Sequence, residues 1–183
     1  MFKRFLPKDA IWFVCTIWLV FVIDFLLIGI NLNQFGIRPR SIGNLPGILF
    51  SPFLHGGLYH IFSNTIPILI LGALINGSVG STKLRSIMIG GAIGSGLGVW
   101  LFSSGGLVVG ASGIVFALLG FLLADAIYNP SIRSWLFAVI SFFAYGGALF
   151  SFVSFLPHIS WAAHFWGFAT GIFLAYLLKS KND

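Results

Sequence analysis

The sequence predicts an all-α membrane protein with six transmembrane helices. Of its 183 residues, 58% are hydrophobic and only 8% are charged, whereas soluble domains carry about 25% charged residues. The chain also divides into six apolar segments, each near the ~20 residues that cross ~30 Å of hydrocarbon. They cover about residues 10–30, 58–76, 84–103, 112–128, 134–156 and 161–178.

The first apolar segment follows a basic N-terminus and is expected to be a retained helix. It is longer than the roughly 7–15 apolar residues of a signal peptide, and a small-residue cleavage site is missing. With no internal repeat or linker, residues 1–183 are expected to form a single domain with short tails of about 1–9 and 179–183.

The basic residues indicate the orientation in the membrane. Six spans place both termini on one side, and cytoplasmic loops carry an excess of Lys and Arg. Arg38 and Arg40 fall on one side, and the other side holds Lys3, Arg4, Lys8, Lys83, Arg85, Arg133, Lys179 and Lys181. We therefore expect cytoplasmic termini. Because the basic residues are scattered, the net charge of +6 does not indicate nucleic-acid binding.

The connection between the first two spans, residues 31–57, is long for a membrane bundle. It combines several Gly and Pro residues with apolar residues such as Ile37, Leu49 and Phe53. It is too apolar for a flexible linker, so we expect short helices and turns at the outer membrane face.

Polar residues begin the second span. His60 and Asn64 are four residues apart, so on a helix they share one face and can hold one anionic oxygen together. His55 lies just before them and has a packing role as its alternative. Zinc proteases use two His at helical spacing with a Glu base between them. Here the two His are five apart and the chain has no Glu, so we expect no metal.

The fourth span is short and begins with Gly110-Ala-Ser112-Gly113. Ser112 has an ordinary interpretation as a helix cap. The flanking glycines favour a reactive serine instead, because they let a substrate backbone approach. The positive end of the helix suits a developing oxyanion.

His164 lies in the last span beside a stripe of small residues, which lets helices pack closely. This stripe is Ala163, Gly167, Gly171 and Ala175, and the fourth span has a matching one of Gly113, Ala117, Gly120 and Ala124. At 1.5 Å per residue, Ser112 lies ~25 Å and His164 ~22 Å above the cytoplasmic boundary. The sequence therefore predicts a Ser–His pair at one depth in the membrane.

The two carboxylates within apolar segments, Asp24 and Asp125, are not expected to orient His164. Asp125 is interpreted as a solvated residue at the membrane interface. Gly146, Gly147 and Ser151 in the fifth span, with Leu156-Pro157-His158 after it, are interpreted as a gate and cap over the pocket.

Together these motifs resemble the rhomboid family of intramembrane serine proteases, over nearly the whole chain. The resemblance implies Ser112 as nucleophile and His164 as general base in a dyad without a carboxylate. It implies His60 and Asn64 as oxyanion-stabilising residues, helped by the Ser112 N–H. Its supporting positions are His55, Gly110, Gly113, Phe116 and Gly167.

Three departures from the family pattern occur, one of which is Ile37-Arg38 in place of the Trp-Arg pair of some first loops. Phe116 stands where many bacterial members have a hydroxyl-bearing aromatic that stacks on the catalytic His. It can stack but cannot donate a hydrogen bond. Asn76 lies near the position of a family Glu, which leaves the polar tie of that Glu in question.

The resemblance implies a serine endopeptidase that cleaves transmembrane segments of membrane proteins near the outer face. It implies no cofactor, no nucleic acid, membrane lipid as surroundings and a place in the bacterial cytoplasmic membrane. An inactive rhomboid-like protein that binds membrane clients is the alternative. A small-solute transporter is disfavoured because there are no paired broken helices. The oligomeric state stays open.

Overall fold

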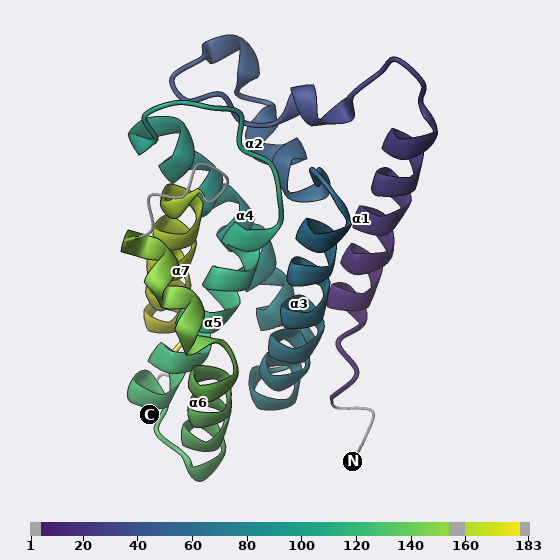
Figure 1. Cartoon of the computed structure of the whole chain (residues 1–183). Coiled ribbons are helices and arrows are strands. Elements are labelled where there is room, and N and C mark those ends of the chain that lie inside the picture. The colour runs from purple at the N-terminus through teal and green to yellow at the C-terminus, as the bar shows by residue number, and fades with distance from the viewer. Residues whose placement is uncertain (1–4, 154–159, 180–183) are drawn as a thin grey trace.

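The structure, a computed structural model, describes residues 5–153 and 160–179, and in these residues helices joined by turns and loops form the fold (Figure 1). Seven α-helices are described rather than six, because a four-residue helix, α2, lies in the first long connection. The α-helices are α1 (Lys8–Leu26), α2 (Gly47–Phe50), α3 (Leu58–Val79), α4 (Ser81–Phe102), α5 (Ser112–Tyr128), α6 (Ile132–Tyr145) and α7 (Trp161–Leu177).

Four stretches are long and apolar enough to cross a membrane: α1, α3, α4 and residues 132–152. α5 is apolar but has only 17 residues, as predicted for the fourth segment, and α7 also has 17. These helices are typical of an integral membrane protein. The count of six spans stays a prediction.

The fifth predicted segment is not one uniform helix. α6 ends at Tyr145, and Gly146–Val153 continues as a 3-10 helix, η5. Two successive glycines, Gly146 and Gly147, disfavour the α-helix where it changes. The predicted end of this segment, and Leu156-Pro157-His158 after it, lie outside the described residues.

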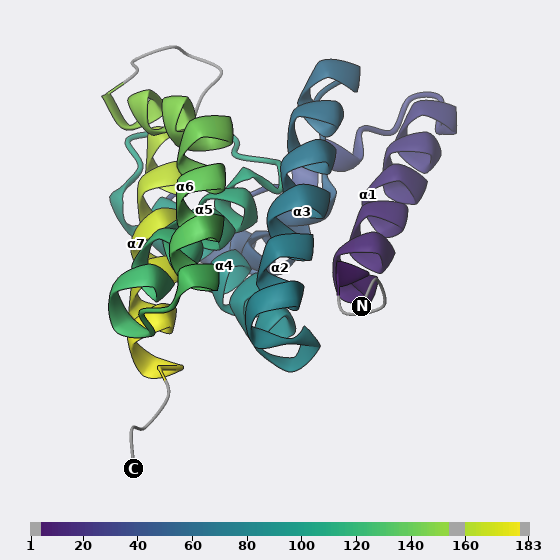
Figure 2. The ribbon, with the colours of Figure 1, turned by 90° about the horizontal axis from the view of Figure 1, so that it is seen from below.

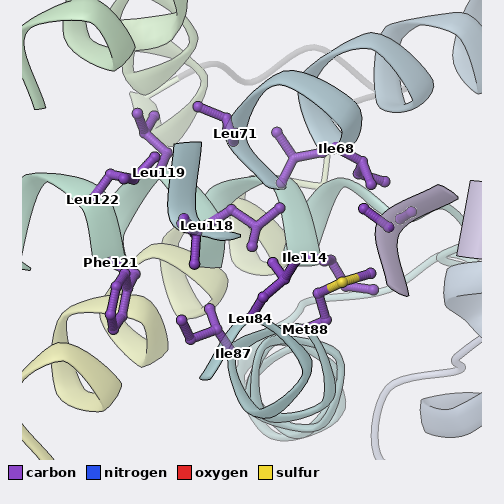
Figure 3. Packing of buried hydrophobic residues seen from close by; sticks show 14 of the residues in the cluster. Ile68, Leu71, Leu84, Ile87, Met88, Ile114, Leu118, Leu119, Phe121 and Leu122 are labelled. Carbon is purple, nitrogen blue, oxygen red and sulfur yellow. The ribbon is translucent and has the colours of Figure 1, made fainter. Parts of the chain in front are cut away.

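α5 lies at the centre of the bundle and contacts α3, α4, α6 and α7. Its residues are buried along nearly its whole length, as expected for a helix that is apolar on every side. α1 lies at the edge beside α3 (Figure 2). Figure 3 shows the core, where Ile68 and Leu71 of α3 and Leu84 of α4 pack around Leu118 and Phe121 of α5.

The predicted small-residue stripes are confirmed as the contact between α5 and α7. A Cβ atom at Gly167 would collide with the backbone carbonyl of Gly113, and one at Gly171 with the carbonyl of Ala117. In the opposite direction, Gly120 lies against the carbonyl of Phe168. The two backbones therefore touch with no side chains between them.

A second glycine stripe, on α4, was missing from the sequence analysis. Gly90, Gly94 and Gly98 recur every four residues, and each lies against a side chain of α7. Those partners are Leu174, Thr170 and Trp166. α7 is thus seated closely on α4 as well as on α5.

Polar contacts join helix ends at one end of the bundle. Lys83 Nζ donates to the Leu178 carbonyl (2.7 Å), and Arg85 pairs with Asp9 (2.9 Å). The start of α4 therefore lies beside the end of α7 and the start of α1. Lys3, Arg4 and Lys181, which were assigned to the same side, lie outside the described residues.

The interpretation of Asp125 as a solvated carboxylate is wrong. Its exposed fraction is 2%, and it accepts a hydrogen bond from Asn129 Nδ2 (2.7 Å). The Ser78 hydroxyl lies at 3.5 Å. The buried carboxylate ties α5 to α3, because buried charges need hydrogen-bond partners.

The long connection consists of short helices: η2 (Leu32–Phe35), η3 (Ile42–Asn44), α2 and η4 (Ser51–Phe53). It lies at the end of the bundle opposite the turn between α5 and α6 (Figure 1). Ile37 and Val108 form an antiparallel bridge with two hydrogen bonds of 2.9 Å. Arg40 Nη2 donates to the Ser103 carbonyl at 2.9 Å, so the connection is fastened to the segment that precedes α5.

Gly171→Ala is expected to destabilise the protein by about 1–3 kcal/mol, because the new methyl group has to displace the Ala117 backbone. Gly147→Ala is the matched control, since nothing lies within 4 Å of its added Cβ. Unfolding of the purified protein in detergent measures both. Equal stability of the two variants would contradict the close α5–α7 contact.

Candidate active site

The turn before α5 requires a glycine. Gly110 has a φ of +117°, in the region that side-chain-bearing residues rarely adopt. A Cβ there would also lie 2.5 Å from His60 Nε2. The Gly110 N–H donates to the Ser51 carbonyl of η4 (2.9 Å). The predicted importance of Gly110 thus has two causes, its backbone conformation and the His60 ring beside it.

Ser112 is the first residue of α5, and Ala111 takes the cap position. Among the described residues, no partner hydrogen-bonds to the Ser112 hydroxyl, so the interpretation as a helix cap is wrong. The side chain is half-buried. The first N–H groups of a helix have no acceptor within the helix, so backbone donors and a free hydroxyl occur together here.

His60 and Asn64 lie on successive turns of α3, on one face as the spacing predicts. Asn64 is 2% exposed, and its Nδ2 donates to the His60 carbonyl (2.9 Å). An amide group has two donor hydrogens, which leaves one for another acceptor. His55 packs edge-on against His60 with ring centroids 5.1 Å apart.

His164 lies on α7, stacked on the ring of Phe116 at a centroid distance of 4.2 Å and an angle of 17°. Phe116 is one helical turn after Ser112 on α5, and residues four apart share a helix face. The Gly113–Gly167 contact lies immediately beside both side chains. Phe116 therefore stacks as expected for its position, even without a hydroxyl.

The start of α5 contacts both of the other helices that carry predicted site residues. Gly110 lies against the His60 ring of α3, and Gly113 lies against the backbone of Ala163 and Gly167 of α7. The start of α5, the first turn of α3 and the first turn of α7 therefore meet in one region. The starts of α5 and α7 are thus adjacent, and the pairing of Ser112 with His164 stays a prediction.

No hydrogen bond joins Ser112 to His164 within the described residues. Instead, His164 Nδ1 lies 2.7 Å from the hydroxyl of Ser151, on η5. Sequence reasoning noticed Ser151 only as part of the possible gate. Its signal was a polar side chain thirteen residues before His164 in an apolar segment, which needs a partner inside a membrane protein.

Asp24 and Asp125 hydrogen-bond to groups other than His164. Asp24 accepts hydrogen bonds from the Leu32 N–H (2.5 Å) and from Asn33 Nδ2 (3.2 Å), so it fastens the start of the long connection. Asp125 is bonded to Asn129. In the part of the chain that the structure describes, neither contacts His164.

Asn76 has a polar tie of its own despite the departure from the family pattern. Its Nδ2 donates to the backbone carbonyl of Leu6 at 3.1 Å. The neutral amide therefore connects the C-terminal end of α3 to the segment that precedes α1. His60 and Asn64 lie near the other end of the same helix.

His55 is 3% exposed, and neither ring nitrogen has a hydrogen-bond partner among the described residues. Burial, followed by the nearby His60, lowers the pKa of His55 from 6.5 to about 4, and the Phe53 backbone opposes this in part. His55 is thus neutral at physiological pH and packs as an apolar ring would.

The low pKa of His55 predicts a stability that depends on pH. Between pH 6.5 and about 4 the unfolded chain binds a proton at this residue and the folded protein does not. The contribution of neutral His55 to the free energy of unfolding is therefore fully present above pH 6.5. It is lost as the pH falls to about 4. His55→Gln should flatten the dependence of the thermal midpoint on pH over this window. An unchanged slope would contradict the assignment.

Comparisons with known proteins identify the family of this chain. The model of the Rhomboid domain matches residues 42–181. An uncharacterized protein of Mycobacterium tuberculosis is 34% identical over 179 residues, which cover 93% of this chain and 74% of the relative.

Two eukaryotic relatives carry the family name. Rhomboid-related protein 3 of Homo sapiens is 27% identical over 201 residues, 94% of this chain and 49% of its own length. RHOMBOID-like protein 1 of Arabidopsis thaliana is 30% identical over 125 residues, 68% of this chain and 32% of its own. The domain match spans most of the chain and contains the starts of α3, α5 and α7, and so the chain belongs to the rhomboid family.

Proposed function

We propose that the protein is an intramembrane serine endopeptidase with Ser112 as nucleophile and His164 as general base. One observation carries the proposal. His164 stacks on Phe116, one turn from a Ser112 hydroxyl that has no hydrogen-bond partner among the described residues. The Gly113–Gly167 contact fixes the two helices at this point.

The chemistry follows from these positions. Ser112 Oγ attacks the scissile carbonyl carbon while His164 takes its proton. His164 then gives this proton to the leaving amine, and the acyl-enzyme forms. Water, deprotonated by His164, then attacks the ester carbonyl. The bond from the acyl group to Ser112 Oγ breaks, His164 returns the proton to Ser112, and the second product leaves as a carboxylic acid. His164 lies close enough to Phe116 for the ring to limit its rotation during both steps.

The oxyanion of each tetrahedral intermediate needs donors. We assign this role to His60, to the second N–H of Asn64 and to the Ser112 backbone N–H. Asn64 is held by its bond to the His60 carbonyl, so its amide is oriented before the substrate arrives. Preorganised donors of this kind are worth about 10²–10³ in kcat each.

Six membrane spans with cytoplasmic termini complete the proposal: α1, α3, α4, α5, α6 with η5, and α7. α5 has 17 residues and α3 has 22, so α5 is about 7 Å shorter at 1.5 Å per residue. Its start therefore lies below the outer end of α3, which leaves room for water above Ser112. Substrates would be transmembrane segments with small or helix-breaking residues near the cleaved bond, in the cytoplasmic membrane of a bacterium.

An inactive rhomboid-like protein that binds membrane clients is the second candidate. The absence of a Ser112–His164 hydrogen bond within the described residues favours it. Catalytic hydrogen bonds are often long or poorly aligned without substrate, and Ser112, His164, His60 and Asn64 are all retained. These residues favour the enzyme.

Ser112→Ala and His164→Ala are each expected to lower cleavage of a model transmembrane substrate by at least about 10³-fold, because each removes one half of the dyad. Ser86→Ala is the matched control, since its hydroxyl bonds only to its own helix at Thr82. A fluorophosphonate should label Ser112 and fail to do so in His164→Ala. Undiminished cleavage by folded Ser112→Ala would exclude the assignment, and wild-type protein that neither cleaves nor labels would support the inactive alternative.

Asn64→Ala is expected to lower kcat by about 10²–10³-fold with little change in KM, because the lost donor acts only on the transition state. Ser63→Ala serves as the comparison, since Ser63 is exposed and donates to the same His60 carbonyl at 2.8 Å. Kinetics with a fluorogenic substrate measure both variants. An equal loss in the two would assign Asn64 to helix structure instead.

A further inference from the structure

The partner of His164 comes from a different element, η5. Ser151 Oγ lies 2.7 Å from His164 Nδ1. The next residue, Phe152, packs against Phe116, with ring centroids 5.5 Å apart, and against Phe168 of α7 at 5.5 Å. η5 therefore holds the imidazole edge through Ser151, while Phe152 packs on the same aromatic ring that stacks on His164.

A histidine that acts as a base needs its other nitrogen held. In the neutral ring one nitrogen carries a hydrogen and the other can accept a hydrogen bond. A hydrogen-bond acceptor beside one nitrogen keeps the hydrogen there and so decides the tautomer. In serine proteases with a triad, a carboxylate holds this nitrogen. Here the three carboxylates of the described helices, Asp9, Asp24 and Asp125, are bonded elsewhere, and a serine hydroxyl lies at Nδ1.

We propose that Ser151 is a positioning residue that accepts the Nδ1–H of His164 and leaves Nε2 free to take the proton of Ser112. This role rests on the proposed function. The ring has only two nitrogens, and one of them is occupied by Ser151. A base that faces Ser112 therefore has to use the other.

The same hydroxyl also acts after the proton transfer. The imidazolium donates from both nitrogens, and a donor with a positive charge makes a stronger hydrogen bond to the oxygen of Ser151. A neutral hydroxyl stabilises the charge less than a carboxylate does. The expected loss on removal is about 10–100-fold, by analogy with hydrogen-bond partners that orient metal-bound histidines, and below the ~10⁴-fold of a triad aspartate.

The kinetic test compares Ser151→Ala with Ser141→Ala, a matched control whose hydroxyl bonds only within α6 to the Phe137 carbonyl (2.7 Å). Ser151→Ala should lower kcat by about 10–100-fold at unchanged KM, and Ser151→Thr, which keeps the hydroxyl, should restore it to within about threefold of wild type. Ser141→Ala should match wild type. Unchanged kcat in Ser151→Ala, or no recovery in the Thr variant, would overturn the role.

The spectroscopic test is independent of activity. Protein with ¹⁵N-labelled histidine and the Ser112→Ala substitution should show His164 protonated at Nδ1, with the signal assigned by its loss in His164→Ala. Adding Ser151→Ala should give a mixture of tautomers. Protonation at Nε2 with Ser151 intact, or no change on its removal, overturns the proposal.

Fluorophosphonate labelling distinguishes failure of the Ser151 role from failure of the proposed protease function. Label on Ser112, together with the expected tautomer, supports both. If no serine is labelled, the proposed function fails, while the tautomer still decides whether Ser151 holds the ring. Label on Ser151 would make it the nucleophile and would overturn the positioning role directly.

Discussion

The close approach of α5 and α7 is the contact on which the rest of the structure depends. Gly113, Gly120, Gly167 and Gly171 remove the side chains between these helices, so that backbone lies on backbone. Dispersion and packing drive helix association in lipid, where burial of apolar surface gives little. The candidate dyad lies at the upper end of this seam, with one member from each helix. A bulkier residue in this seam would therefore also separate Ser112 from His164.

The long connection, residues 31–57, positions the start of α5 and with it Ser112. The Ile37–Val108 bridge and the Gly110–Ser51 hydrogen bond fasten residues 107–110 to it. Gly110 then turns the chain next to His60 with a backbone conformation that favours glycine. The site is thus formed by three helix starts and one fastened loop, and a hydrogen bond from a fifth segment, η5, reaches His164.

Much of this was predictable, because membrane helices follow apolar length and because small residues at spacing four have few other uses. The start of α5 at Ser112, the α5–α7 seam and the Phe116 stack were all anticipated. Other features depend on three-dimensional neighbours. The burial of the Asp125 carboxylate depends on its hydrogen-bond partners Asn129 and Ser78. Gly90, Gly94 and Gly98 showed the same spacing as the recognised stripes and were overlooked. The bond of Ser151 to His164 depends on how η5 folds back after Gly146, which periodicity does not encode.

The place of His164 on α7 has a consequence for biosynthesis. α7 follows the other helices in the chain and packs between α4 and α5 along two glycine seams. In the proposed enzyme, the ribosome would therefore deliver Ser112, His60 and Asn64 well before His164. Until α7 inserts, the nascent chain would hold Ser112 with no base to accept its proton, so the order of synthesis would itself delay the proposed activity until the bundle is complete.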